Sequence, residues 1–197
     1  MKANYENWHI LSNGKPYTFF IHYVPLWGND SMSEDSLTLR QLIWDFKNGD
    51  RQRWARELIE KKIRETFDDP SELTFVCIPA SSDHKNEMRF KRFSKKLCEA
   101  TGMINGFKHI HIFADRQPRH LGGDPVENWQ PDPEFFRGKK VILFDDMVTR
   151  GDSMRASASI LEMAGASVVG YLSLGHTVPR VINPSLRHPC TGTPVFG

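Results

Sequence analysis

The sequence lacks the features that would place the protein in a membrane or in an oxidising compartment. No stretch approaches the roughly 18 consecutive apolar residues that a membrane-spanning helix requires, and the N-terminal segment Met1 to Trp8 has no apolar core of a signal peptide. Only three cysteines occur, Cys77, Cys98 and Cys190, and they form no Cys-x-x-Cys pair. We therefore expect a cytoplasmic protein with reduced thiols and no membrane partner.

The sequence also lacks an excess of charge of either sign. Its 26 basic and 24 acidic residues give a net charge of +2, which provides no general argument for binding to nucleic acid but leaves room for a local basic patch. With 197 residues, 39% of them hydrophobic, the chain is long enough for one domain with a full core. We therefore treat residues 1–197 as a single domain.

Strand-like and helix-like patterns alternate along the chain. Short apolar or β-branched runs predict strands, and apolar residues at i, i+3, i+4 and i+7 predict helices. The predicted strands are 17–24, 73–78, 109–113, 140–144 and 168–174, and the predicted helices run through Leu39 to Phe46, Ala55 to Phe67, Phe90 to Ala100 and 152–164. This alternation is typical of an α/β fold with a mostly parallel central sheet flanked by helices.

Ligands of such sheets bind beyond the carboxyl ends of the strands. Three loops are expected there, after Ile78, after Phe113 and around Asp145 and Asp146. Because the strands are predicted to be parallel, we expect the three loops to converge on one edge of the sheet.

The most specific motif is the run from Val141 to Ser153. Four apolar residues precede Asp145 and Asp146, and a turn with the pattern Thr-x-Gly-x-Ser follows (Thr149, Gly151 and Ser153). Paired carboxylates can accept hydrogen bonds from sugar hydroxyls, and a tight turn at a helix N-terminus can bind phosphate. Helix capping by the two aspartates is the alternative for an isolated Asp-Asp pair.

This motif resembles the signature of type I phosphoribosyltransferases, which bind 5-phosphoribosyl 1-pyrophosphate (PRPP). The resemblance implies that Asp145 and Asp146 face the ribose hydroxyls and approach a metal through those hydroxyls or water, with Mg²⁺ as cofactor. It also implies that the loop Val148, Thr149, Arg150, Gly151, Asp152 and Ser153 holds the 5-phosphate. Arg150 departs from the usual pattern, because small residues or threonine are common there; it could contact phosphate or point to solvent.

Two upstream blocks resemble the ComF group of this family. They are Leu42 to Gly49 and Val76 to Pro79, the latter followed by the basic and aromatic run Arg89 to Ser94. The resemblance covers roughly residues 37 to 175. It implies a type I phosphoribosyltransferase-like core at about 37–177, with the N-terminal segment and the C-terminal tail as a small variable hood. In related enzymes the loop at Pro79, Ala80, Ser81 and Ser82 binds pyrophosphate. The chain departs from ComF proteins in having no cysteine before Cys77, and therefore no N-terminal zinc ribbon.

Phosphoribosyl transfer needs cations around the leaving pyrophosphate. The candidates are Lys85, Arg89, Arg116 and Arg119, of which Arg116 and Arg119 would act in catalysis together with Asp145 and Asp146. In this family a flexible loop closes over PRPP, and Arg116 to Gly123 is the candidate. A solvated polar loop is the alternative.

Two functions are compatible with these patterns. The first is an enzyme that moves ribose 5-phosphate between pyrophosphate and a nitrogenous acceptor, acting on PRPP or a phosphoribosylated small molecule, and forming a homo-oligomer. The second is a non-catalytic ComF-like module linked to DNA uptake, binding PRPP or single-stranded nucleic acid. For the second, the cluster at 85–96 supplies basic residues with Phe90 and Phe93; the helical spacing of these phenylalanines instead favours an amphipathic helix with a basic outer face. A glutamine-dependent amidotransferase is disfavoured, since there is no terminal cysteine nucleophile.

Overall fold

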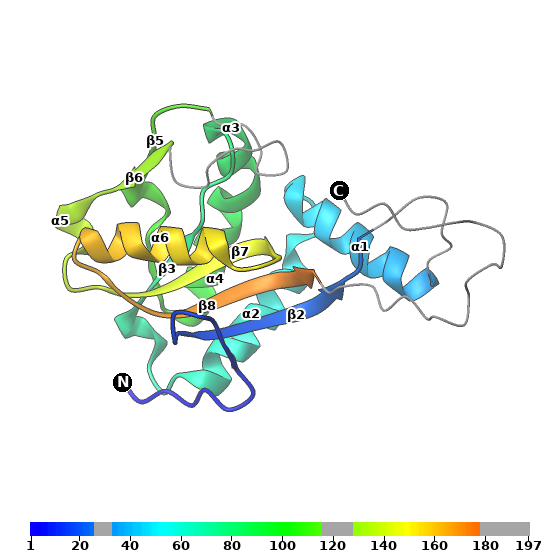
Figure 1. The fold of residues 1–197 in the computed structure, drawn as a ribbon, viewed down its shortest axis with the longest axis horizontal. Helices are drawn as coiled ribbons and strands as arrows, with labels where there is room; N and C mark the ends of the chain where they lie inside the picture. The colour runs from blue at the N-terminus through cyan, green and yellow to red at the C-terminus, as the bar shows by residue number, and fades with distance from the viewer. Residues whose placement is uncertain (26–32, 116–127, 178–197) are drawn as a thin grey trace, which may run out of the picture.

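A six-stranded sheet forms the centre of the molecule, in the order β1-β2-β8-β7-β3-β4 (Figure 1). The computed structural model describes residues 1–25, 33–115 and 128–177. The strands of the sheet are β1 (His9–Ile10), β2 (Pro16–Tyr23), β3 (Leu73–Cys77), β4 (Ile104–Asn105), β7 (Lys140–Val148) and β8 (Ser167–Thr177). Every neighbouring pair is parallel except β1 and β2. The predicted α/β fold with a mostly parallel sheet is confirmed.

Helices cover both faces of the sheet (Figure 1). They are α1 (Glu34–Lys47), α2 (Gln52–Thr66), α3 (Asp83–Asn86), α4 (Arg92–Thr101), α5 (Pro133–Phe136) and α6 (Asp152–Met163), with the short 3₁₀ turns η1 (Pro70–Glu72) and η3 (Phe107–His109) and the π-helical turn η2 (Glu87–Lys91). Within the described ranges, no helix is both long and apolar enough to cross a membrane.

Alternating side chains of the strands build two cores. On β7, Ile142 and Phe144 pack with residues of α1, α2 and α4. Val141 and Leu143 point the other way and pack with residues of α5, α6 and β6. The buried strands read as continuous apolar runs in the sequence for this reason, since both faces of the sheet are covered.

The ends of α1 follow from its terminal residues. Ser33 precedes the helix, and its side chain accepts a hydrogen bond from the backbone N–H of Ser36. After Asn48 the chain leaves the helix at Gly49, whose φ of +81° is favourable only for glycine. The predicted end at Asn48-Gly49 is confirmed.

The predicted strand 109–113 does not join the central sheet. Residues Ile110–Ile112 form β5, which pairs antiparallel with β6 (Trp129–Pro131) in a separate two-stranded sheet. Only one face of β5 is covered, and His111 is exposed. The edge position beside β3 is taken instead by the two-residue strand β4, which is too short to show a pattern in the sequence. The expectation that this strand belongs to the central sheet was therefore wrong, while the loop that follows it lies largely outside the described residues.

The N-terminal segment contributes to the central sheet. Strand β2 runs parallel to β8, with Tyr17 opposite Tyr171 and Tyr23 opposite Thr177. The sheet thus begins before residue 37, where the sequence placed the start of the core. The proposed C-terminal part of the hood, after residue 177, lies outside the described residues.

Candidate functional site

The connections of the sheet reverse direction between β3 and β7. After β3 the chain passes through α4 to β4 on one side, whereas after β7 it passes through α6 to β8 on the other. The crossover helices consequently lie on opposite faces, and in such sheets ligands bind at this point, beyond the carboxyl ends of the strands. The loops that begin at Pro79 and Val148 flank this point.

The two aspartates lie within β7 rather than after it. Strand β7 continues to Val148, and Asp145 pairs with Ser173 of β8. Adjacent residues of a strand point to opposite faces, so Asp145 lies on the α6 side while Asp146 lies on the α1 and α4 side. The sequence expectation that both carboxylates face one ribose is untested, but the strand geometry separates the two side chains.

Asp146 is the centre of a buried ion network. Only 4% of the residue is exposed, and its carboxylate lies 2.5 Å from Nη1 of Arg89 and 3.4 Å from Nζ of Lys47. Arg89 also donates from Nε to the carbonyl of Lys47 at 3.1 Å. Two cations are thus held at the sheet edge by one carboxylate.

The π-helical turn explains how Arg89 reaches this network. The turn η2 interrupts the helix between α3 and α4, and Gln52 donates from Nε2 to the carbonyl of Arg89 at 2.6 Å. Such turns are frequent at functional sites. The sequence offered Arg89 as a candidate cation, but nothing in it indicated the π turn or the role of Lys47.

Asp145 is partly buried beside this network. Burial raises the pKa of Asp145 to about 7, the Asp146 carboxylate adds to the rise, and Lys47 and Arg89 oppose it. One carboxylate oxygen of Asp145 also accepts a hydrogen bond from the backbone N–H of Asp146 at 2.8 Å. The side chain therefore changes charge near neutral pH.

The predicted phosphate loop is stabilised by two arginines. Arg150 is exposed and donates from Nε to Asp152 at 3.1 Å. Arg155, which the sequence did not single out, pairs with the same carboxylate and donates from Nη1 to the Arg150 carbonyl at 2.9 Å. Two guanidinium groups and one carboxylate leave the loop with an excess positive charge, as an anion site requires. A contact of Arg150 with phosphate stays a prediction.

Gly151 is the N-terminal cap of α6. Its φ is +75°, and a Cβ there would lie 3.3 Å from both terminal methyl groups of Leu11. Glycine thus serves the backbone conformation and the close approach of the β1–β2 turn. No side chain caps the helix at this residue, so the N-terminal end of α6 carries the partial positive charge of the helix dipole toward the loop.

The second predicted loop is ordered by Asn86. Pro79 and Ala80 are buried, while Ser81 and Ser82 are partly exposed. The Asn86 side chain is buried and accepts the backbone N–H of Ala80 at 3.2 Å. Ser82 caps α3 by accepting the N–H of Lys85 at 3.3 Å, and the Lys85 side chain is exposed on that helix. The structure brings this loop beside Asp145 and Asp146, because the N–H of Ile78 donates to the carbonyl of Phe144.

The proposed lid cannot be placed. Arg116 and Arg119, together with the rest of the Arg116 to Gly123 segment, lie outside the described residues. Their predicted part in catalysis stays a prediction.

The side chains of the site can be compared with the Mg²⁺ that the family resemblance implies. Within the described residues there is no group of three histidine, cysteine, aspartate or glutamate side chains that could bind an ion. Asp146 is already neutralised by two cations. This arrangement fits Mg²⁺ bound through substrate phosphates, since Mg²⁺ keeps water and phosphate ligands more readily than it enters an all-protein site.

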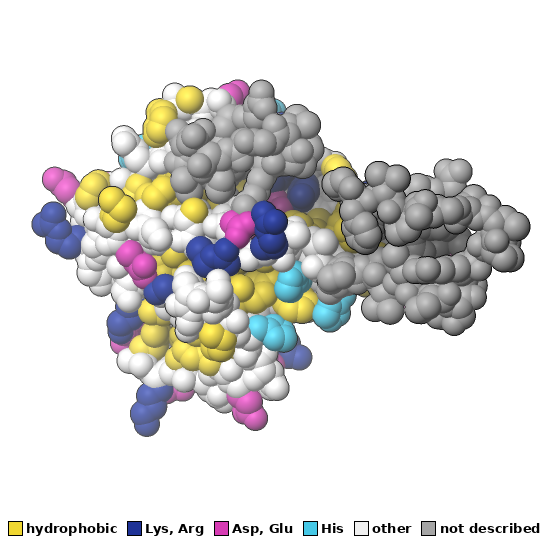
Figure 2. Space-filling view, viewed as in Figure 1, with side chains coloured by type: hydrophobic (Ala, Val, Ile, Leu, Met, Phe, Trp, Pro, Cys, Tyr) yellow, Lys and Arg dark blue, Asp and Glu magenta, His cyan; other side chains and the backbone are white. Residues whose placement is uncertain are grey.

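A surface group of aromatic rings lies next to the phosphate loop. Phe19 is the centre of the group: its ring stacks on His9 at 5.3 Å and meets the edges of His22 and His176 at 4.9 Å each. His176 joins the group to the loop, because its Nε2 lies 3.2 Å from the carbonyl oxygen of Thr149. Figure 2 shows histidine side chains on this face beside basic and acidic ones. The sequence did not single out this group, since its members are scattered over the first 22 residues and β8.

The basic and aromatic helix offers no exposed phenylalanines. Phe90 and Phe93 are 1% and 2% exposed and pack in the core, and Arg89 turns inward to Asp146. The exposed Lys91 pairs with Glu87 at 2.5 Å. The structure thus agrees with an amphipathic helix that has a basic outer face.

The chain is similar in sequence to three phosphoribosyltransferases. No protein-family model matches it. It is 26% identical over 181 residues to rat (Rattus norvegicus) amidophosphoribosyltransferase, which covers 91% of this chain and 30% of that protein. It is 45% identical over 38 residues to adenine phosphoribosyltransferase of Treponema denticola, with 19% of this chain and 20% of that protein covered. It is 39% identical over 46 residues to orotate phosphoribosyltransferase of Coccidioides immitis, with 23% and 19% covered. The matches span less than a third of the length of each relative.

Two solved structures show a distant likeness. One, described as the allosteric regulatory enzyme of purine biosynthesis, has a TM-score of 0.41 at 19% identity over 75% of this chain and 31% of that chain. The other, a purine phosphoribosyltransferase of Pyrococcus horikoshii, has a TM-score of 0.36 at 16% identity over 71% and 91%. Neither likeness is strong enough to support an assignment. The sequence similarity, found with three enzymes of one kind, supports the predicted relationship to the phosphoribosyltransferases.

Proposed function

We propose that this chain binds PRPP and transfers its phosphoribosyl group to, or from, a nitrogenous acceptor. The observation that carries the proposal is the loop Val148–Ser153, placed at the topological switch point and preceded by Asp145 and Asp146. The sequence similarity to three phosphoribosyltransferases supports it.

The positions of the two carboxylates suggest a division of roles. Asp145 shares the α6 side with the phosphate loop, so it is the carboxylate we assign to the ribose hydroxyls. Asp146 orients Lys47 and Arg89, and these cations would stabilise the departing pyrophosphate. Ser81 and Ser82 would add hydrogen bonds to the pyrophosphate. The predicted cations Lys85, Arg116 and Arg119 would approach the pyrophosphate from the solvent side.

Magnesium would join the site with the substrate. The pyrophosphate and ribose oxygens would supply its main ligands, with Asp145 reached through hydroxyls or water. The ion would neutralise the charge that develops on the leaving group.

The acceptor would bind where aromatic rings are available. The rings around Phe19 are suited to stacking on a planar nitrogen heterocycle. Burial lowers the pKa of His176, so this ring is neutral at pH 7 and does not repel such a ligand by charge.

The proposal is tested by the release of pyrophosphate from PRPP. We expect the full chain with Mg²⁺ to release it when a suitable nitrogenous acceptor is supplied, and Asp145→Asn to abolish the release. Saturable PRPP binding with no release for any acceptor would favour the alternative, a non-catalytic ComF-like binding module.

A further inference from the structure

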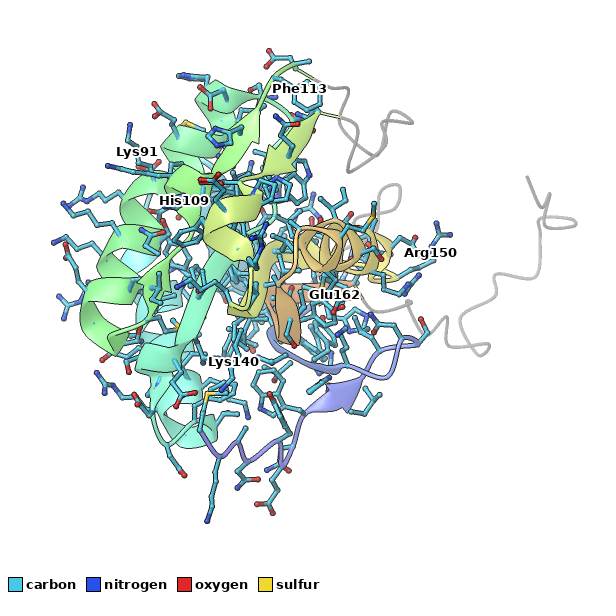
Figure 3. All side chains as sticks on the ribbon, turned by 90° about the vertical axis from the view of Figure 1, so that its left-hand side faces the viewer. Lys91, His109, Phe113, Lys140, Arg150 and Glu162 are labelled. Carbon is cyan, nitrogen blue, oxygen red and sulfur yellow. The ribbon has the colours of Figure 1, made fainter. Side chains whose placement is uncertain are left out.

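A pocket of about 560 Å³ lies on the helical layer formed by α2 and α4. Its size is in the range of small-ligand sites. It is distinct from the phosphate loop, because α2 and α4 cover one face of the sheet and α6 covers the other. Figure 3 shows this separation: Lys91, next to the start of α4, and Arg150 of the loop are on opposite sides of the molecule.

The pocket is lined mainly by cations. Five basic side chains, Arg51, Arg53, Arg56, Arg92 and Lys96, face a single acidic residue of the lining, Asp50. They come from two helices and the turn before α2. Arg53 and Lys96 also make pairs within their own helices, with Glu57 (i, i+4) and Glu99 (i, i+3), but cations from α2 and α4 face one another across the pocket.

Neighbouring carboxylates neutralise this lining only in part. Arg51 pairs with Asp45 at 3.4 Å. Glu57 is shared by Arg53 at 2.6 Å and Arg56 at 3.9 Å. Glu99 is shared by Lys96 at 2.8 Å and Lys95 at 3.9 Å. Among the described residues no carboxylate pairs with Arg92, and the buried Nε of Arg56 has no hydrogen-bond acceptor. Positive charge is therefore left over.

The backbone adds donors at the same place. Arg51 precedes α2 without capping it through its side chain, and no acidic residue occupies the first turn of this 15-residue helix. The first N–H groups of the helix thus add their partial positive charge at the pocket wall.

We propose that this pocket is a second site, which binds a small anion with two or more linked phosphate groups, free or as part of a nucleotide. Several cations around a pocket of this size match a chain of phosphates better than a single carboxylate. The proposal does not depend on the proposed function: none of the five basic side chains is assigned to the PRPP site, although Gln52 of the lining donates a hydrogen bond to the Arg89 carbonyl.

Calorimetric titration of the full chain with tripolyphosphate, without Mg²⁺, tests this proposal. We expect saturable binding that weakens as salt is added. The double variant Arg56→Gln/Arg92→Gln should lower the affinity by about tenfold or more, since it removes two guanidinium contacts. The matched control Lys61→Gln/Lys108→Gln removes two exposed charges outside the pocket. It should change the affinity for tripolyphosphate less than about twofold. Gly151→Ala, a change in the phosphate loop, should leave tripolyphosphate binding intact.

Three results would overturn the proposal. The first is the absence of binding at millimolar tripolyphosphate. The second is binding that survives in Arg56→Gln/Arg92→Gln but is lost in Gly151→Ala, which would place the anion in the phosphate loop. The third is a lack of tripolyphosphate binding together with binding of single-stranded DNA that requires Arg56 and Arg92. This result would make this face a nucleic-acid surface. Repeating the titration with ATP separates a free polyphosphate from a nucleotide, and tighter binding of either one supports the proposal.

Discussion

The surroundings of Asp145 disfavour the ionised form of its carboxyl group. The carboxylate is partly buried next to Asp146, and its pKa is raised to about 7. A raised folded-state pKa means that the folded protein binds a proton the unfolded chain has already released, so this group lowers stability increasingly as pH rises from about 4 to about 7. The site thus retains a destabilising charge, as functional sites commonly do.

We predict that Asp145→Asn stabilises the protein at high pH. At pH 8 the substitution removes a penalty that can reach about 4 kcal/mol, at 1.36 kcal/mol for each pKa unit. The gain should shrink between about pH 7 and pH 4, where the folded wild type binds a proton. Urea unfolding of the wild type and of Asp145→Asn between pH 4 and pH 8 measures this difference in the free energy of unfolding. A stability difference that does not vary with pH would contradict the raised pKa.

The partners of Asp146 give a second prediction. Arg89→Met should lower the free energy of unfolding by about 1–3 kcal/mol, because it leaves the buried carboxylate with Lys47 alone. Lys91→Met, two residues along, removes only an exposed pair with Glu87 and should cost less than about 0.5 kcal/mol. Chemical denaturation of the two variants distinguishes these cases, and equal losses would argue against a structural role for the network.

At this scale the sequence identified functional residue types but not their partners. The motif around Asp145 and Asp146 was recognisable because its order along the chain is informative. The link from Asp146 to Arg89 joins residues 57 positions apart, and it depends on a π turn that no residue pattern indicates. Arg155 was missed for a similar reason, since one arginine in a helix has no distinctive spacing.

At the scale of elements, the turn between β7 and α6 depends on a glycine. We predict that Gly151→Ala costs about 1–2 kcal/mol of stability, because an alanine at positive φ is strained. It should also weaken PRPP binding, since the strained φ and the 3.3 Å contact of the new Cβ with the Leu11 methyl groups disturb the backbone of the loop. Thermal unfolding and PRPP titration measure the two effects.

Gly138→Ala is the matched control for this prediction. Gly138 has a similar φ of +73°, but a Cβ there meets nothing within 4 Å. We expect a comparable loss of stability with unchanged PRPP binding. If both variants bound PRPP like the wild type, the loop would not be the phosphate site.

The elements themselves were predictable where their side chains face a full core. Helices α1, α2 and α6 have buried residues at helical spacing, and β3 is mostly apolar and buried throughout because it is covered on both faces. The predictions failed for the short strands at or beyond the edge of the central sheet. Strand β5 has strand-like residues, yet it belongs to the separate two-stranded sheet. The two residues of β4 join the central sheet by pairing with β3 alone.

At the scale of the whole molecule, the proposed PRPP site lies between the two hydrophobic cores, which pack on opposite faces of the sheet. The loops at Pro79 and Val148 leave strands that are buried between both layers, so a ligand held by them would connect α6 with the helices of the opposite face. The parallel sheet was predictable from the alternation of patterns, but its strand order was not. The order sets the switch point, and it results from packing between distant segments.

We predict that PRPP with Mg²⁺ raises the unfolding temperature of the chain. A ligand present at about 100 times its dissociation constant stabilises the folded state by about 2.7 kcal/mol. Ribose 5-phosphate, which lacks the pyrophosphate, should give a smaller shift. Thermal unfolding monitored by circular dichroism checks both, and identical shifts for the two ligands would exclude a role for the pyrophosphate cations.

The most direct test of the account is calorimetric titration of the full chain with PRPP in the presence and absence of Mg²⁺. The account predicts saturable, Mg²⁺-dependent binding that is lost in Asp145→Asn/Asp146→Asn and preserved in Gly138→Ala. The absence of PRPP binding to the wild type at millimolar ligand would contradict it.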